Sequence, residues 1–155
     1  MQQLVDFSGD GAIGLVAAAA VAAHECGHAV QHATAYGPLK MRSSLVPVVS
    51  FASKYVSWIL LLGVLMVESF PGVLLLGIGL FAKNTLFSFI TLPVEINASQ
   101  RALVWLNRAG ITTHYTHRDA ESALRSAAYT YVVAALSSLA NLVYYVMIYL
   151  NRSRD

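Results

Sequence analysis

Charged residues are scarce in this sequence, and their scarcity indicates the class of protein. Aspartate, glutamate, lysine and arginine make up 12% of the 155 residues, whereas about a quarter of the residues of a soluble domain are charged. Because 57% of the residues are hydrophobic, the composition indicates a membrane protein with the lipid bilayer as a partner. The net charge of +2 and the lack of a basic cluster argue against a nucleic-acid partner.

Cysteine is also scarce, and we expect no leader at the start of this sequence. The single cysteine, Cys26, excludes an intrachain disulfide and fits a reducing compartment. Residues 1–10 contain no basic segment followed by a long apolar stretch, so we expect no signal peptide there. Membrane insertion would then depend on internal hydrophobic spans.

The hydrophobic segments predict an all-α membrane helical bundle within a single domain, residues 1–155. Residues 12–23 are apolar on every face but too few to span a bilayer, so their helix is predicted to be buried, and Gly37-Pro38 is predicted to stop it. The last helix includes 24 uncharged residues, enough to span. The predicted elements are a first helix at 12–36, a transmembrane hairpin at 44–92, a helix at 93–108 and a C-terminal helix at 118–150.

The distribution of positive charge predicts the topology. Glu68 is the charged residue at the turn of the hairpin, whereas most basic residues lie on its open side. By the positive-inside rule the open side is cytoplasmic. Lys54 and Lys83 are about equally far from the turn and are expected to reach the same membrane face. Eight of the ten basic residues belong to the open side: Lys40, Arg42, Lys54, Lys83, Arg101, Arg108, Arg118 and Arg125.

The run His24-Glu25-Cys26-Gly27-His28 matches the H-E-x-x-H pattern on the first predicted helix. Side chains at i and i+4 lie on one helix face, so His24 and His28 can bind one zinc ion. Glu25 lies between them and can reach a zinc-bound water, from which it would take a proton as general base. The pattern therefore predicts a zinc metallopeptidase.

The third zinc ligand is less obvious from the sequence. A third histidine six residues after His28 is excluded, because position 34 is Thr34. His32 lies too far along the helix axis from His24 to share its metal, and we expect it to support the site or line a groove. Glu95 is the preferred candidate, because a carboxylate beside the end of a hydrophobic helix is costly unless it is paired or metal-bound.

Two alternatives to this assignment remain open at this point. Glu95 could instead form an ion pair with Arg101 or Lys83. His114 and His117 are further candidate ligands, or donors that stabilise a transition state, although they lie in a polar loop where histidines are common.

Several separate motifs resemble the YugP-type family of bacterial membrane zinc metallopeptidases. They occur in the same order as in that family, and the similarity extends over about residues 8–145. The resemblance implies one zinc ion per chain, bound through His24, His28 and Glu95, with Glu25 as general base. The family is bacterial, and the positive-inside rule places the open side of the hairpin, with the histidine helix and Glu95, in the cytoplasm, so we expect a multi-pass protein of the bacterial cytoplasmic (inner) membrane with its active site on the cytoplasmic side. The similar stretches are Ala22–Ala33, Tyr36–Leu39 with Arg42-Ser43, Thr91–Ser99, Arg101–Leu103 and Ala127–Val132.

The segment around Glu95 also resembles the glutamate-bearing helix of HtpX-like membrane proteases. In those proteins an aspartate commonly lies four residues after the glutamate and supports a zinc-ligating histidine. Ser99 occupies that place here, with Asn97 nearby, and we expect both to orient the ligands. The chain also departs from its family, whose members usually have a transmembrane helix and a polar segment before the histidine helix, whereas 23 residues precede His24.

The leading hypothesis is a zinc endopeptidase that hydrolyses a peptide or membrane-protein substrate at the cytoplasmic membrane face. One alternative is a site-2-type intramembrane protease, but no Asp-Gly pair follows His28 to supply that class's third ligand. The other is a catalytically impaired metal-binding membrane scaffold. A structural zinc would need a fourth protein ligand, and Cys26 is expected to face away from the metal.

Overall fold

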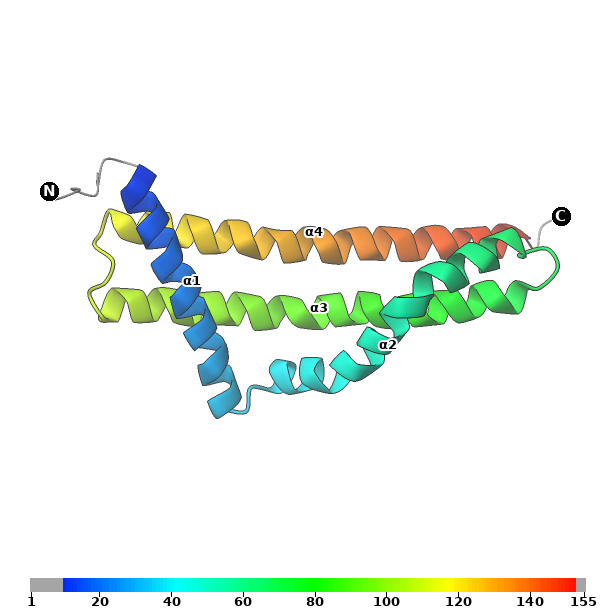
Figure 1. Cartoon of the computed structure of the whole chain (residues 1–155), viewed down its shortest axis with the longest axis horizontal. Coiled ribbons are helices and arrows are strands. Elements are labelled where there is room, and N and C mark those ends of the chain that lie inside the picture. The colour runs from blue at the N-terminus through cyan, green and yellow to red at the C-terminus, as the bar shows by residue number, and fades with distance from the viewer. Residues whose placement is uncertain (1–9, 153–155) are drawn as a thin grey trace, which may run out of the picture. The chain divides into compact units, whose positions relative to one another are not determined.

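The computed structural model describes residues 10–152, most of which lie in four α-helices. Its elements are α1 (Asp10–Ala33), α2 (Gly37–Leu65), α3 (Pro71–Arg108) and α4 (Thr116–Asn151), shown in Figure 1. No β-strand occurs in this part of the chain. The predicted all-α fold class is confirmed.

Each of these four helices is long and apolar enough to cross a membrane, judged by length and composition. For α1 the candidate span is Ile13–Ala33. The prediction of a helix too short to span counted only residues 12–23. Residues 24–33 continue the helix, and apart from histidines their one charged side chain is Glu25. The composition and the helix lengths together support a membrane protein.

Two predicted helix boundaries were wrong. The helix predicted over 93–108 is not separate, because α3 continues from Pro71 through Pro93 to Arg108. Proline inside an apolar helix removes one backbone hydrogen bond, which neighbouring groups in a membrane bundle can compensate.

Gly37-Pro38 also does not stop α1. The helix ends earlier, where the Tyr36 amide donates to the Gln31 carbonyl and the Ala35 amide donates to the His32 carbonyl. Ala35 has a φ of 52°, which completes this Schellman cap. Gly37 and Pro38 instead begin α2, where the missing proline N–H leaves no helical hydrogen bond unmade.

The described chain divides into two compact units, each built from two separate segments. Unit 1 comprises Met1–Tyr36 and Pro93–Thr130, and unit 2 comprises Gly37–Leu92 and Tyr131–Asp155. The predicted single metallopeptidase domain over 1–155 stays a prediction.

Unit 2 contains the predicted transmembrane hairpin. A Cβ added to Gly63 of α2 would lie 2.6 Å from the Leu74 Cα of α3, so the two backbones touch near the turn. Farther from the turn, the Asn84 amide donates to Ser53 Oγ at 3.4 Å. Both contacts belong to one antiparallel register, which places Lys54 level with Lys83 along the hairpin. Its core consists of Val56, Leu60, Leu74 and Ile78.

Unit 1 positions α1 across the C-terminal part of α3, as Figure 1 shows. The buried residues of α1 recur every three or four positions and form one stripe: Ala20, Ala23, Gly27 and Gln31. Alanine and glycine on this stripe allow the helix backbones to approach closely, which favours helix association in membranes. The two alanines of the stripe form a core with residues of α3 and α4: Ala20, Ala23, Ala102, Leu106, Ala120 and Leu124.

At Gly27 the backbones of α1 and α3 approach each other closely. A Cβ at this position would lie 2.6 Å from the Ala98 carbonyl oxygen and 3.2 Å from the Ala98 Cα. Contacts with backbone atoms cannot be relieved by a rotamer change, so a larger residue must push the helices apart. Since Gly27 lies between the two histidines of H-E-x-x-H, this approach also sets how far they are from α3.

Replacing Gly27 with alanine is therefore expected to lower the unfolding free energy by about 1–3 kcal/mol and to weaken zinc binding. Gly14→Ala in the same helix is the matched control, because its Cβ would meet no described atom within 4 Å apart from the adjoining backbone of α1. The control should be neutral or stabilise by up to about 1 kcal/mol. Thermal unfolding in detergent micelles and zinc titration measure both effects. Equal behaviour of the two variants would contradict the close approach.

Candidate metal centre

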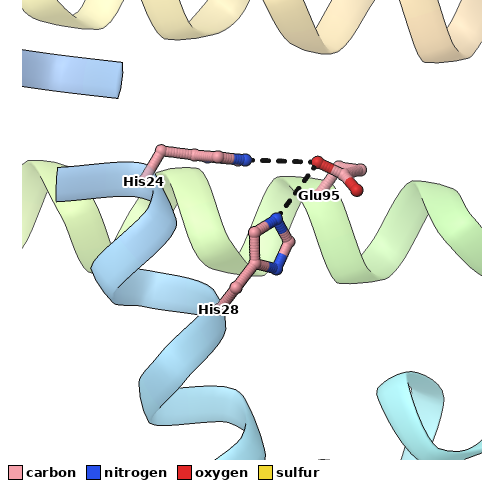
Figure 2. A group of neighbouring side chains, drawn as sticks. All are labelled: His24, His28 and Glu95. Carbon is pink, nitrogen blue, oxygen red and sulfur yellow. Dashed lines mark hydrogen bonds and ion pairs between the residues drawn. The ribbon is translucent and has the colours of Figure 1, made fainter. Parts of the chain in front are cut away.

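Two histidines of α1 and one glutamate of α3 meet inside unit 1. His24 Nε2 lies 3.2 Å from Glu95 Oε2, and His28 Nε2 lies 3.5 Å from the same oxygen. The two imidazole rings are nearly perpendicular, with centroids 4.7 Å apart. Figure 2 shows both rings pointing from α1 toward Glu95. Two histidines on successive turns of α1 and a glutamate on the facing helix α3 thus bring three ligand-type side chains to one point.

The geometry of this group fits a zinc ion. All three ligand atoms lie within 4.8 Å of one another. Zinc bonds of about 2.0–2.1 Å at a tetrahedral angle place two ligand atoms about 3.3–3.4 Å apart, close to the two separations from Glu95. In residues 10–152, His24, His28 and Glu95 are the group of three ligating side chains that gathers in this way. We call these three residues the metal centre.

Burial differs among the members of the metal centre. Glu95 is 3% exposed, and an isolated carboxylate in such a place is strongly disfavoured unless a cation or donor compensates it. The side chains of His24 and His28 are 16% and 19% exposed. The centre is therefore closed on the side of Glu95 and reachable on the side of the histidines.

The Nδ1 atom of each histidine has a partner of its own. His24 Nδ1 lies 3.1 Å from the Ser99 hydroxyl, and His28 Nδ1 lies 3.0 Å from Gln31 Oε1. Partners at Nδ1 orient an imidazole and leave its Nε2 for a metal, and loss of such a partner typically lowers metal affinity 10–100-fold.

Gln31 was missed by the sequence analysis, which chose His32 instead. His32 is exposed, whereas Gln31 is fully buried and contacts His28. Helical spacing held the signal, because a residue three positions after His28 and seven after His24 lies on the face of both histidines. Asn97, expected to orient the ligands, accepts a hydrogen bond from the Gln31 amide at 3.1 Å.

The remaining candidates are placed as follows. Glu25 and Cys26 are exposed, in keeping with side chains outside the buried stripe of α1. His117 contacts the Thr112 hydroxyl through Nδ1 at 3.1 Å, and it lines a cavity together with His114. Neither belongs to the metal centre: His114 precedes α4 in the connecting loop, whereas His117 lies in the first turn of α4.

Comparison with known proteins now identifies the family. The family described as "putative neutral zinc metallopeptidase" matches residues 12–150, a range that includes all three members of the metal centre. The chain belongs to this metallopeptidase family.

A relative of known sequence agrees with the family assignment. The chain is 44% identical over 136 residues to the "putative membrane protease YugP" of Bacillus subtilis (strain 168). The matched region covers 88% of this chain and 60% of that relative, so the chain spans less than two thirds of the relative's length. No solved structure matches it. The resemblance inferred from the motifs is confirmed.

Proposed function

We propose that the protein is a zinc-dependent membrane endopeptidase that binds one zinc ion per chain and hydrolyses peptide bonds. The observation that carries the proposal is the meeting of His24, His28 and Glu95 at zinc-ligand separations, directly beside Glu25 in the helix. A zinc ion bound there would acidify a coordinated water and polarise a scissile carbonyl.

Glu25 is the proposed general base. It follows His24 directly on α1, about 100° around the helix, and its side chain is exposed rather than buried with the ligands. A carboxylate in this place can accept a proton from the attacking water and later donate it to the leaving amine. Glu95 cannot serve both as a metal ligand and as the general base, because it is buried against the two imidazoles.

The number of ligands supports catalysis over a structural metal site. A structural zinc is closed by four protein ligands, whereas a catalytic zinc keeps one position open for water. Within the described residues the centre offers three ligating side chains, and the partly exposed histidines leave a path for a substrate.

The proposed substrate is a peptide or a segment of a membrane protein, cleaved at the cytoplasmic face of the bacterial inner membrane. Four candidate spans support action at a bilayer, and the positive charge on the open side of the hairpin supports the cytoplasmic face. The name of the Bacillus subtilis relative, a "membrane protease", agrees with this setting.

The purified chain in phospholipid nanodiscs provides the direct test. We expect one equivalent of zinc per chain, cleavage of a fluorescently labelled unfolded protein such as casein, loss of cleavage with a chelator, and its return with equimolar zinc. Metal analysis and gel electrophoresis read out both quantities. Zinc binding without any cleavage would favour the metal-binding scaffold, and failure to bind zinc would refute the metal centre itself.

A further inference from the structure

Gln31 is a fully buried polar side chain whose amide makes three hydrogen bonds. Its Nε2 donates to the Val94 carbonyl at 2.8 Å and to Asn97 Oδ1 at 3.1 Å, while its Oε1 lies 3.0 Å from His28 Nδ1. Burying an amide is costly unless its groups are paired. An apolar residue would fill the same space in a helix interface, so the complete pairing points to a role beyond packing.

The partners determine which way the Gln31 amide points. The Val94 carbonyl can only accept, so the nitrogen of Gln31 must face it. The oxygen of Gln31 is then directed at His28 and can only accept as well. His28 must therefore carry a proton on Nδ1, which leaves Nε2, the ring nitrogen that faces Glu95, as the one available to bind a metal.

Asn97 is fixed by the same reasoning. Its Oδ1 accepts from Gln31 Nε2 and also from Arg101 Nε at 2.8 Å. An arginine side chain can only donate, so the Asn97 oxygen must face both partners. The chain of contacts from Arg101 through Asn97 to Gln31 has one consistent set of donors and acceptors.

His24 lacks an equivalent constraint. Its Nδ1 partner is the Ser99 hydroxyl, which can rotate to donate or to accept and therefore suits either tautomer. The two histidines of the metal centre are thus held differently, one by a fixed amide and one by an adaptable hydroxyl.

We propose that Gln31 is a positioning residue that holds His28 in the Nδ1–H tautomer, ready to bind metal through Nε2, and that Asn97 and Arg101 fix the Gln31 amide. This proposal rests on the proposed metal site at His24, His28 and Glu95. It assigns a role to a residue outside the H-E-x-x-H pattern, and it is independent of whether the bound metal cleaves peptides.

The first test measures zinc affinity, by competition with a chromophoric chelator, in two variants that each remove one hydrogen-bonding group beside a histidine. Gln31→Met keeps the length of the side chain but removes its amide, and it should weaken zinc binding about 10–100-fold. Ser99→Ala should weaken it less, because the serine hydroxyl does not select a tautomer. Equal losses in the two variants, or wild-type affinity in Gln31→Met, would overturn the proposal.

A second test compares two substitutions of Asn97, one that keeps the acceptor oxygen and one that removes it. A role in packing alone would not predict that the first restores zinc affinity. Asn97 uses only its oxygen in both hydrogen bonds, so Asn97→Asp should keep them and retain affinity within a few-fold of wild type. Asn97→Ala leaves the Gln31 amide without that acceptor and should lose more. An Asp variant that binds zinc no better than the Ala variant would contradict the assigned orientation.

A readout without metal distinguishes positioning from general loosening. In ¹⁵N NMR of metal-free protein in micelles, we expect His28 to show a protonated Nδ1 in wild type and a mixture of tautomers in Gln31→Met, with unchanged helical circular dichroism. A mixture already present in wild type would refute the role of Gln31. Wild-type protein that binds zinc but cleaves nothing would refute the proposed peptidase and leave the Gln31 result standing.

Discussion

Replacing Glu25 with glutamine is expected to lower peptide-bond hydrolysis about 10²–10⁴-fold while leaving zinc binding unchanged. The substitution keeps the size of the side chain and removes its ability to take a proton, and a positioned general base contributes a factor of this order. Because Glu25 is exposed and is not one of the three gathered ligands, the unfolding free energy should change by no more than about 0.5 kcal/mol.

Single-turnover cleavage of a labelled substrate, measured with metal content on the same sample, checks this expectation. Glu121→Gln is the matched control, since Glu121 is also an exposed helical glutamate and should keep both activity and zinc. Full activity in Glu25→Gln would assign the base elsewhere. Loss of zinc in that variant would mean that Glu25 holds the metal.

Replacing Glu95 with alanine is expected to release zinc nearly as effectively as replacing His28 with alanine. Each change removes one of three ligands, so the loss of affinity should exceed the 10–100-fold typical of an outer partner such as Gln31. The metal-free protein should tolerate the change well, because removal of a buried carboxylate also removes the cost of keeping it from water. A large loss of metal binding with little change in metal-free stability is the signature of a ligand.

Zinc per chain after dialysis against a fixed free-zinc concentration, together with thermal unfolding of the metal-free form, separates these effects. Glu68→Ala, at the turn between α2 and α3, is the control and should retain one zinc. A Glu95→Ala protein that still holds one zinc would place the third ligand elsewhere. His114 and His117 would then be the residues to replace next.

The sequence was most informative where the structure depends on neighbours along one helix. His24, Glu25 and His28 share a helix, so their relation follows from helical spacing. The choice between Gln31 and His32 shows the limit of that argument. Both lie about one turn beyond His28, and only the packing of α1 on α3 determines that Gln31 is buried.

Long-range features could be predicted only in part, for a different physical reason. Glu95 was a candidate because an unpaired carboxylate is unfavourable near a membrane, but the same argument allowed an ion pair with Arg101. The contact of Gly27 with Ala98 decides which groups of α3 meet the histidines, and no local pattern encodes it. Pro93 was interpreted as a helix boundary because proline lacks a backbone N–H. The sequence alone does not reveal how neighbouring groups in a helical bundle compensate the missing hydrogen bond.

The separation of 71 residues between His24 and Glu95 has a consequence for biosynthesis. At about 5–20 residues per second, the ribosome needs roughly 4–14 seconds to reach the glutamate after it has made the first histidine. By the end of this interval the nascent chain carries the complete H-E-x-x-H run and most of the membrane hairpin but still lacks its third ligand. On our proposal, a partly synthesised chain cannot hold its metal firmly, and hydrolytic activity would arise only after the hairpin has been translated.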